Sequence, residues 1–371
     1  MKSILRSRRT RETSLSYLLG ASLVVVAGLV TLRQTFGQTN RYIVTELSSD
    51  DAGQVPCKIN SLGDIVGRKD SPLEGGPRAT IWNRSRSNSK HLGALWDGDY
   101  SSASGINDAG EVVGVSNTGK GILPFVWTAT AGLRNIPLLP GDSCGRANAI
   151  NRHGHVAGYS SGPNGARAFL WTRKTGVRDL AVLPGSNSST ARDVNDSDEV
   201  AGMCASSAGK RAVLWTKTGS VSDLGVLPGD SESEAAAINN AGDVVGYSKG
   251  PAGMHAFLWT KATGMQDLGV LPGGNLSDAL AINNSQEIVG TSSSALGDRA
   301  FIWTKQTGLV DLNNASSAHL GIVFIEAHSI NSKGEILIMG KVNHGMASPD
   351  DDKQCAPAPP SSFVLTPVTS R

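Results

Sequence analysis

The sequence predicts an all-β protein, a seven-bladed β-propeller in which each blade has four antiparallel strands. A dipeptide of Ile or Val followed by Asn recurs seven times at intervals of 44 to 48 residues. Tryptophan recurs at matching intervals. The chain also contains 44 glycines among 371 residues, and only 18% of its residues are charged. This composition is typical of short strands joined by many turns.

Two repeat markers define the same seven units. The dipeptide occurs at Ile59-Asn60, Ile106-Asn107, Ile150-Asn151, Val194-Asn195, Ile238-Asn239, Ile282-Asn283 and Ile330-Asn331. The tryptophans are Trp82, Trp127, Trp171, Trp215, Trp259 and Trp303, and Phe363 to Leu365 stand at the matching place in the seventh unit. Aromatic residues alternate around these positions with apolar neighbours between them, so both faces of the strand are apolar. The tryptophans are therefore predicted to form the core between blades.

One unit shows the four expected strands most clearly. Its apolar segments cover residues 235–239, 243–247, 255–259 and 265–270, and turn sequences separate them. In the Asn-x-x-Gly turns, Asn suits the first position of a type I turn and Gly supplies the positive φ that follows. The repeated asparagines are therefore interpreted as turn residues, and no metal or cofactor is expected.

The ends of the repeat array predict how the ring closes. Residues 42–47 resemble the fourth strand of a unit but precede the first Ile-Asn marker, whereas the seventh unit stops soon after its third strand. Residues 42–47 are therefore expected to pair with residues 361–366. This pairing would complete the last blade and remove the open edges of the fold.

The N-terminal segment has the features of an export signal. Six Lys or Arg among the first 33 residues stand against Glu12, a local charge of +5 in a chain of net charge +2, which leaves −3 for the remainder. A basic stretch to Arg11, an apolar run over residues 17–32 and small or polar residues up to Thr39 predict a signal peptide at residues 1–39. An uncleaved membrane anchor is the alternative, because no Ala-x-Ala site follows the run.

Residues 40–371 are then expected to form a single propeller domain that is secreted or extracytoplasmic, in the periplasm or at the cell surface. Its mild acidity gives no electrostatic reason to expect nucleic-acid binding. The expected partner is a protein or carbohydrate at the cell surface, and the membrane is a partner only if the leader remains attached. The protein is expected to be a monomer.

One unit resembles a known family. The segment from His255 to Trp259, followed by Gln266 to Gly269 and Leu271 to Gly274, is similar to the HAF family of extracellular repeat proteins, named for its His-Ala-Phe triplet. The likeness covers about residues 42–340, but only one unit has the complete triplet. The resemblance implies bacterial export and an extracellular location, and it implies no established reaction.

The longer connections are predicted to share one face of the ring, opposite the short Asn-x-x-Gly turns. Loops on a rigid scaffold are the usual place of function, so a ligand face is expected around Trp96, Asp97, Asp99 and Tyr100. The four cysteines also fall near this face. The pairs Cys144 with Cys204 and Cys57 with Cys355 are predicted as disulfides, although four cysteines allow three connectivities.

The sequence favours a binding, adhesion or scaffold module over an enzyme. The alternative is a hydrolase or lyase with its active site at the central channel, which would need a polar set that breaks the repeat. His153 with His155 is the clearest break, but it lies in a turn on the short-turn side. Asp97, Asp99 and the run Asp350 to Asp352 are acidic candidates on the other face. No catalytic residue is assigned.

Overall fold

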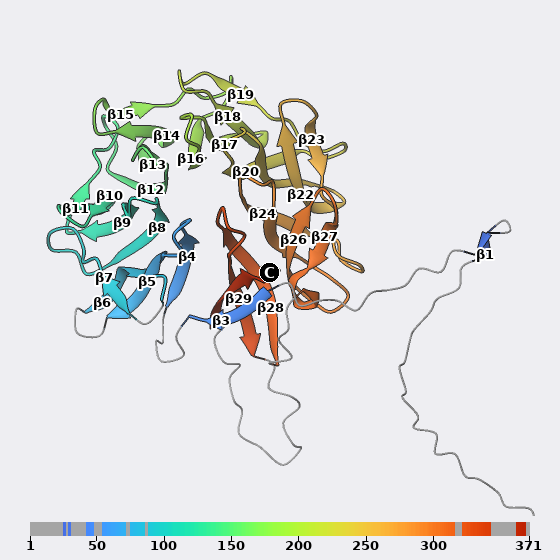
Figure 1. Cartoon of the computed structure of the whole chain (residues 1–371). Helices are drawn as coiled ribbons and strands as arrows, with labels where there is room; N and C mark the ends of the chain where they lie inside the picture. The colour runs from blue at the N-terminus through green and yellow to red at the C-terminus, as the bar shows by residue number, and fades with distance from the viewer. Residues whose placement is uncertain are drawn as a thin grey trace, which may run out of the picture. The chain divides into compact units, whose positions relative to one another are not determined.

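Each repeat folds as four short strands, because its apolar segments alternate with turn sequences. The computed structural model describes residues 25–26, 29–30, 42–47, 54–71, 75–85, 88–315, 321–342 and 361–368. Within residues 40–371, seven four-stranded antiparallel sheets form a ring (Figure 1). The prediction of a seven-bladed β-propeller is confirmed.

The strand bounds follow the repeat closely. Blades 1 to 3 contain β4 (Val55–Ile59), β5 (Ile65–Ser71), β6 (Gly76–Trp82), β7 (Ser89–His91), β8 (Ser101–Ile106), β9 (Val112–Thr118), β10 (Gly121–Thr128), β11 (Gly132–Asn135), β12 (Cys144–Ile150), β13 (Val156–Gly162), β14 (Gly165–Thr172) and β15 (Gly176–Asp179). Blades 4 to 6 contain β16 (Ser188–Val194), β17 (Val200–Ser206), β18 (Gly209–Trp215), β19 (Val221–Asp223), β20 (Glu232–Ile238), β21 (Val244–Gly250), β22 (Gly253–Thr260), β23 (Gly264–Asp267), β24 (Ser277–Ile282), β25 (Ile288–Ser292), β26 (Arg299–Thr304) and β27 (Gly308–Asp311). Blade 7 contains β28 (Ile322–Ile330), β29 (Ile336–Val342), β30 (Ser361–Pro367) and β3 (Tyr42–Glu46), and a short 3-10 turn, η2 (Leu312–Asn314), precedes it.

Residues 1–39 form a separate unit. Its described part consists of β1 (Val25–Val26) and β2 (Leu29–Val30), which pair with each other. The rest of the segment predicted as signal peptide or anchor lies outside the described residues. Across the described ranges as a whole, the structure contains no helix with the length and apolarity needed to cross a membrane.

The N-terminal strand closes the ring, as predicted. Strand β3 pairs antiparallel with β30, from Tyr42 opposite Pro367 to Glu46 opposite Phe363, and it forms the outer edge of the last blade, whose strand order is β28, β29, β30, β3 (Figure 1). Leu47 extends the pairing with a hydrogen bond of 2.9 Å from its N–H to the carbonyl oxygen of Ser362. The last blade is therefore made from both ends of the repeat array.

The repeated asparagines form the turns as predicted and also join the blades. In each repeat the Asn Oδ1 accepts backbone hydrogen bonds within its turn, as Asn239 does from Ala241 and Asp243. The Nδ2 atom donates to the backbone carbonyl of the corresponding Asn in the next blade. These seven bonds of 2.9–3.4 Å run from Asn60 through Asn107, Asn151, Asn195, Asn239, Asn283 and Asn331 back to Asn60.

In six of the seven blades the innermost strand has a β-bulge opposite a glycine of the second strand, and in blade 7 Ile338 stands at that place. In blade 5 the register shifts between Ala235 and Ala237, which brings the carbonyl oxygen of Glu234 close to Gly246 on the next strand. A Cβ at Gly246 would lie 2.0 Å from that oxygen. Five other blades repeat this approach at 1.9–2.2 Å. The repeated Gly in the second strand is therefore explained by space and not by its φ.

The tryptophans lie in or against the cores between blades. Trp82, Trp127 and Trp215 are buried, whereas Trp171, Trp259 and Trp303 are partly buried and pack against core clusters. For Trp82 and Trp215 deep burial accompanies a smaller residue two positions earlier, Thr80 or Val213, whereas Trp127 is buried although Phe125 stands there. In blade 3, Phe169 fills the space over Gly158, whereas in blade 4 the corresponding residue is the smaller Val213, and the ring of Trp215 lies over Gly202. One aromatic ring therefore fills this space in either case.

Two faces of the ring differ in their connections. The short-turn face carries the turns between first and second strands and between third and fourth strands. The opposite face carries the connections from each fourth strand to the next blade, such as residues 136–143 between β11 and β12; we call it the long-loop face. The connection at residues 162–165, on the same face, is a tight hairpin because Gly162 and Gly165 still pair.

Candidate functional site

Two positions on the innermost strands depart from the repeat. On each innermost strand we count positions back from the repeated Asn. Position −4 is a fully buried Ala in blades 2 to 7, which packs between blades. Position −3 holds Cys57, Ser104, Asn148, Arg192, Ala236, Leu280 and His328, and position −5 holds Val55, Ser102, Arg146, Thr190, Glu234, Asp278 and Glu326. The scaffold positions therefore repeat while these two positions vary.

A cavity of about 500 Å³ lies where four successive innermost strands meet, β12, β16, β20 and β24. Position −3 of blades 3 to 6 and position −5 of blades 5 and 6 contribute to it, together with Tyr247 on β21. Its lining residues are Asn148, Arg192, Glu234, Ala236, Tyr247, Asp278 and Leu280. Glu234 and Asp278 stand near the beginnings of β20 and β24, so this part of the cavity lies toward the long-loop face.

Glu234 is the centre of a hydrogen-bonded charge cluster. It is buried, and it accepts hydrogen bonds from Arg192 Nε at 2.9 Å, from Lys210 Nζ at 2.9 Å and from the Tyr247 hydroxyl at 3.1 Å. Burial alone would raise the pKa of Glu234, but the charge of Arg192 and the hydrogen bonds from both cations outweigh burial and hold the pKa below its usual value. Glu234 is therefore an ionised, fully occupied acceptor.

Asp278 has the opposite environment. Its Oδ1 atom is buried and makes no hydrogen bond to any described residue. The pKa of Asp278 is raised from 3.8 to about 7. Burial is the main cause, and the negative charges of Glu234 and Glu326 on the neighbouring innermost strands add to it. The charge of Arg192 opposes the shift. Asp278 is therefore close to half-protonated at neutral pH.

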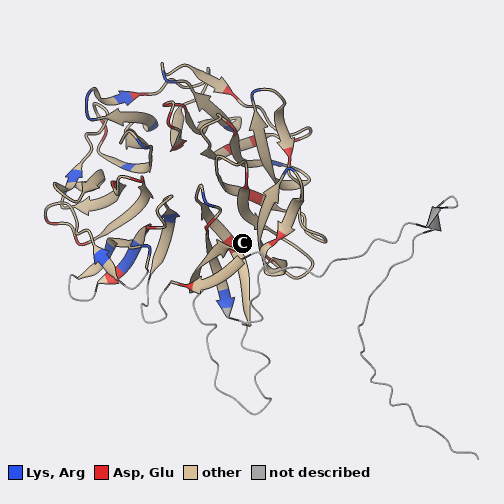
Figure 2. Ribbon diagram, in the orientation of Figure 1, with Lys and Arg blue, Asp and Glu red and all other residues tan. Residues whose placement is uncertain are grey.

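Glu326 is paired on its other side with His328, whose Nδ1 lies 3.3 Å from Glu326 Oε1. Burial lowers the pKa of His328 although Glu326 opposes the shift, so His328 is neutral at pH 7. The cavity lining thus combines one cation, two carboxyl groups, a phenol and an amide, and Lys210 and Glu326 are charged neighbours of its two carboxyl groups. Acidic residues occur on the innermost strands β20 and β24, and residues of both charge signs are spread around the ring (Figure 2).

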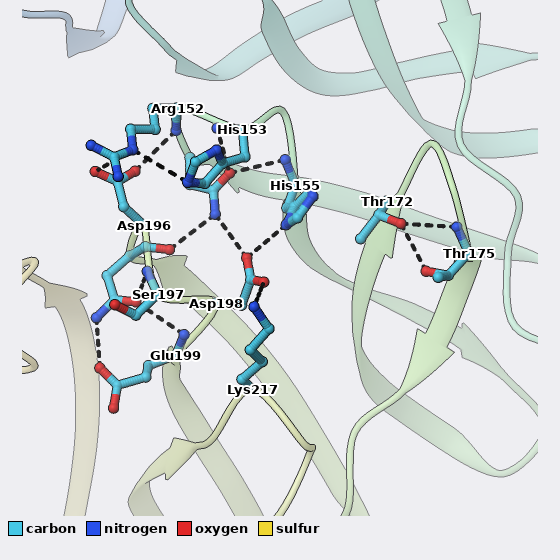
Figure 3. Close-up of polar contacts among 12 residues, drawn as sticks. Arg152, His153, His155, Thr172, Thr175, Asp196, Ser197, Asp198, Glu199 and Lys217 are labelled. Atoms are coloured by element: carbon cyan, nitrogen blue, oxygen red, sulfur yellow. Dashed lines mark hydrogen bonds and ion pairs between the residues drawn. The ribbon is translucent and has the colours of Figure 1, made fainter.

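His153 and His155 are the clearest departure from the repeat. His155 connects blade 3 to blade 4 on the short-turn face (Figure 3). His155 stands where the other repeats have a carboxylate, and Asp198 in the next blade stands where most turns have Gly. His155 Nδ1 and Asp198 Oδ1 lie 2.6 Å apart, and Lys217 Nζ lies 3.4 Å from Asp198 Oδ2. Asp198 also accepts a hydrogen bond from Asn151. The carboxylate that serves the blade 3 turn is thus supplied by blade 4.

Asp198 adopts this place at a conformational cost. Its φ is +63°, in the left-handed region that favours glycine. Hydrogen bonds from His155 and Asn151, together with the charge of His155, outweigh burial and lower the pKa of Asp198. The site is interpreted as a structural connection between blades. The described residues contain no group of three or more His, Cys, Asp or Glu that could hold a metal ion.

The predicted ligand face lies apart from the channel cavity. Trp96 is 71% exposed with φ +42°, on the connection between β7 and β8. Asp97 accepts a hydrogen bond from the Gly119 N–H, Asp99 accepts one from Asn117 Nδ2, and the Tyr100 hydroxyl accepts one from Arg68. These polar groups hold the loop and do not converge with Trp96. The run Asp350 to Asp352 lies outside the described residues.

The predicted disulfide between Cys144 and Cys204 is wrong, because both residues are free thiols in the structure. Cys144 Sγ lies 3.7 Å from the Ser161 carbonyl on its own blade, whereas Cys204 is buried in the core cluster between blades 3 and 4. Burial raises the pKa of Cys204 and of Cys57. Cys57 is also a free thiol, and its predicted partner Cys355 lies outside the described residues.

Sequence analysis missed the channel residues although a signal for them was present. Position −4 is Ala in six of the seven blades and position 0 is always Asn, whereas positions −3 and −5 vary, and departures from a repeat indicate positions that do not serve the scaffold. Strand alternation groups positions −3 and −5, which are two residues apart, but it does not say which face of the strand is turned to the channel.

No protein-family model matches the chain, and no curated protein matches its sequence. Its fold resembles virginiamycin B lyase from Staphylococcus aureus, with 12% identity over 88% of this chain and 99% of that one and a TM-score of 0.54. Oligogalacturonate lyase in complex with manganese gives 12% identity over 94% and 96%, with a TM-score of 0.53. TolB from Acinetobacter baumannii, of which the chain spans 62%, gives 13% identity over 67% of this chain with a TM-score of 0.47. At such identities the likeness concerns the fold alone.

Proposed function

We propose that the chain is an exported binding propeller whose ligand is a small polar molecule, held in the cavity of the central channel. The cavity is lined by charged, amide and phenol groups from four blades. The observation that carries the proposal is the break in the repeat at these positions, since a scaffold alone gives no reason for polar variation there. A few placed polar groups within a concave site are typical of ligand binding.

The proposed site is therefore in the channel and not in the loop around Trp96. The cavity still lies toward the long-loop face, because Glu234 and Asp278 stand near the starts of their strands. The tripartite leader and the resemblance to the HAF family support export. We further propose that the protein acts at the cell surface, where a protein or carbohydrate is its partner.

A thermal-shift screen of monosaccharides, amino acids and amines tests the proposal. Ala236 lines the cavity, so Ala236→Trp would fill it, whereas Ala262→Trp adds the same bulk on an exposed turn. Compounds that raise the Tm of the unaltered protein should also raise that of Ala262→Trp and leave that of Ala236→Trp unchanged. Equal stabilisation of Ala236→Trp would contradict a channel site.

A second candidate function is a hydrolase or lyase at the same channel, and the environment of Asp278 favours it. A carboxyl group with a pKa of about 7 can both take up and release a proton at neutral pH, and Tyr247 lines the same cavity. Two structures of the same fold carry lyase names. If the protein is such an enzyme, its rate should change with a pKa near 7, and Asp278→Asn should remove that step. Unchanged activity in Asp278→Asn would contradict this role.

A further inference from the structure

The charges around the cavity are not balanced. Arg192 and Lys210 both contact Glu234, and Glu326 is paired with a neutral His328. When all groups are ionised, two cations therefore face three carboxylates; both cations contact Glu234, and neither Asp278 nor Glu326 is paired with a cation of the described residues. The other cation on a neighbouring innermost strand, Arg146, is directed to Ser104. No cation of the described residues forms an ion pair with Asp278.

The free acceptor of Asp278 lies beside an apolar surface. Leu280 is two residues further along β24, Ala236 stands on the adjacent strand β20, and all three residues line the same cavity. A buried carboxyl oxygen without a partner is costly unless a ligand or water supplies a donor. An apolar wall beside it suits methylene groups, which gain free energy by leaving water.

We infer that the channel cavity binds a primary alkylammonium group, with the ammonium on the carboxylate of Asp278 and the methylene chain against Ala236 and Leu280. The inference rests on the proposed channel site and names its ligand class. An anion would meet Asp278 and Glu234 in the cavity lining and the nearby negative charge of Glu326. A polyol could use Asp278 as an acceptor but would leave its charge unbalanced.

The same chemistry can come from a free diamine or from the lysine side chain of a peptide. Both carry a methylene chain that ends in an ammonium group, and a cavity of about 500 Å³ has room for either. The two sources differ in whether an amide backbone lies at the other end of the chain. They are separated by the choice of probe in the experiment.

Calorimetric titration of the purified protein with 1,5-diaminopentane and with 1,5-pentanediol isolates the ammonium group, because the chains are equal in length. At pH 8 the diamine should bind at least about tenfold more tightly than the diol. The protonated amine keeps its charge between pH 6 and 8, whereas Asp278 titrates near 7. Diamine affinity should therefore fall about tenfold from pH 8 to pH 6, since a proton then competes for the carboxylate.

Two variants locate the effect. Asp278→Asn should abolish both the preference for the diamine and its dependence on pH, whereas Asp179→Asn, the same change on the outer strand β15, should leave both unchanged. Nα-acetyl-lysine methylamide as a third probe separates the sources: tighter binding than the diamine indicates a lysine side chain, and weaker binding indicates a free amine.

Equal binding of diol and diamine, or undiminished diamine binding by Asp278→Asn, would overturn the inference. Absence of diamine binding would also overturn it. If the thermal-shift screen still finds another ligand that Ala236→Trp excludes, the proposed function stands and only the ligand class is wrong. If Ala236→Trp excludes no ligand, the proposed channel site itself is wrong.

Discussion

The side-chain amide of Asn331 donates a hydrogen bond of 2.9 Å to the backbone carbonyl of Asn60, which lies 271 residues earlier in the chain. This bond is the last of the seven that link the repeated asparagines around the short-turn face. It joins blade 7 to blade 1 at the point where the ring closes. Asn331 also accepts hydrogen bonds from the backbone N–H groups of Lys333 and Glu335. One buried amide thus orders its own turn and connects two blades.

Replacing this asparagine should destabilise the ring measurably. Asn331→Ala leaves the N–H groups of Lys333 and Glu335 without their acceptor and removes one of the two donors to the Asn60 carbonyl, and we expect a loss of about 2–4 kcal/mol in the free energy of unfolding. Urea denaturation measures the loss. Asn275→Ala on an exposed loop is the control and should change stability by less than about 0.5 kcal/mol. Equal effects of the two substitutions would contradict a role for the asparagine ring.

Removing strand β3 should open the ring. A chain that lacks residues 1–47 loses the pairing with β30 and the buried side chains of Tyr42 and Leu47, and it leaves β30 as an exposed edge. We expect a lower Tm and association in size-exclusion chromatography. A chain that lacks only residues 1–39 keeps β3 and is the control. Recovery of the Tm on adding a peptide of residues 40–48 would support the mechanism, and an unchanged Tm without β3 would refute it.

Gly246→Ala tests the bulge argument. The added Cβ would lie 2.0 Å from the carbonyl oxygen of Glu234, so the two strands must separate, and we expect a loss of more than about 3 kcal/mol. Gly264 has φ +69° and open space around its Cβ position, so Gly264→Ala should cost only about 1–2 kcal/mol. Chemical denaturation compares the two. A smaller effect at Gly246 than at Gly264 would show that the strands can shift cheaply.

Asp278 should make stability fall as pH rises. Because its pKa in the folded protein is about 7, above the ordinary 3.8, the folded state keeps the proton longer than the unfolded chain. The contribution of the protonated Asp278 to the free energy of unfolding is complete below about pH 4 and declines as pH rises to 7. Asp278→Asn should therefore stabilise the protein at pH 8 by up to about 4 kcal/mol and change little at pH 4. A difference that does not vary with pH would contradict the buried, unpartnered carboxyl.

His155 and Asp198 should depend on each other. His155→Glu brings a second carboxylate beside Asp198, and Asp198→Gly leaves Asn151 and His155 without their acceptor. The double substitution restores the arrangement of the other repeats, with Gly in the turn and a carboxylate four residues after the Asn. The double variant should be more stable than the sum of the two losses predicts, by about 1–3 kcal/mol. Additive losses would mean that the two residues act independently.

The sequence carried more information about the scaffold than about the site. Asn239 and Gly242 predicted their turn because both residues act within four positions of each other. The pairing of residues 42–47 with the last blade was predictable because an extra strand at one end matched a missing strand at the other. The Cys144–Cys204 pair failed because adjacent blades do not imply facing side chains. Cys204 points into the core, and Cys144 lies at the start of an innermost strand.

The chain by itself determined the number of blades, the strand pattern, the turns and the closure of the ring, since these depend on short-range periodicity and on counting. Only the tertiary structure decided which side chains meet in the channel. Glu234, Asp278 and Glu326 come from three blades, each separated by more than 40 residues. The proton affinity of Asp278 then follows from its neighbours and its burial, which no local pattern records.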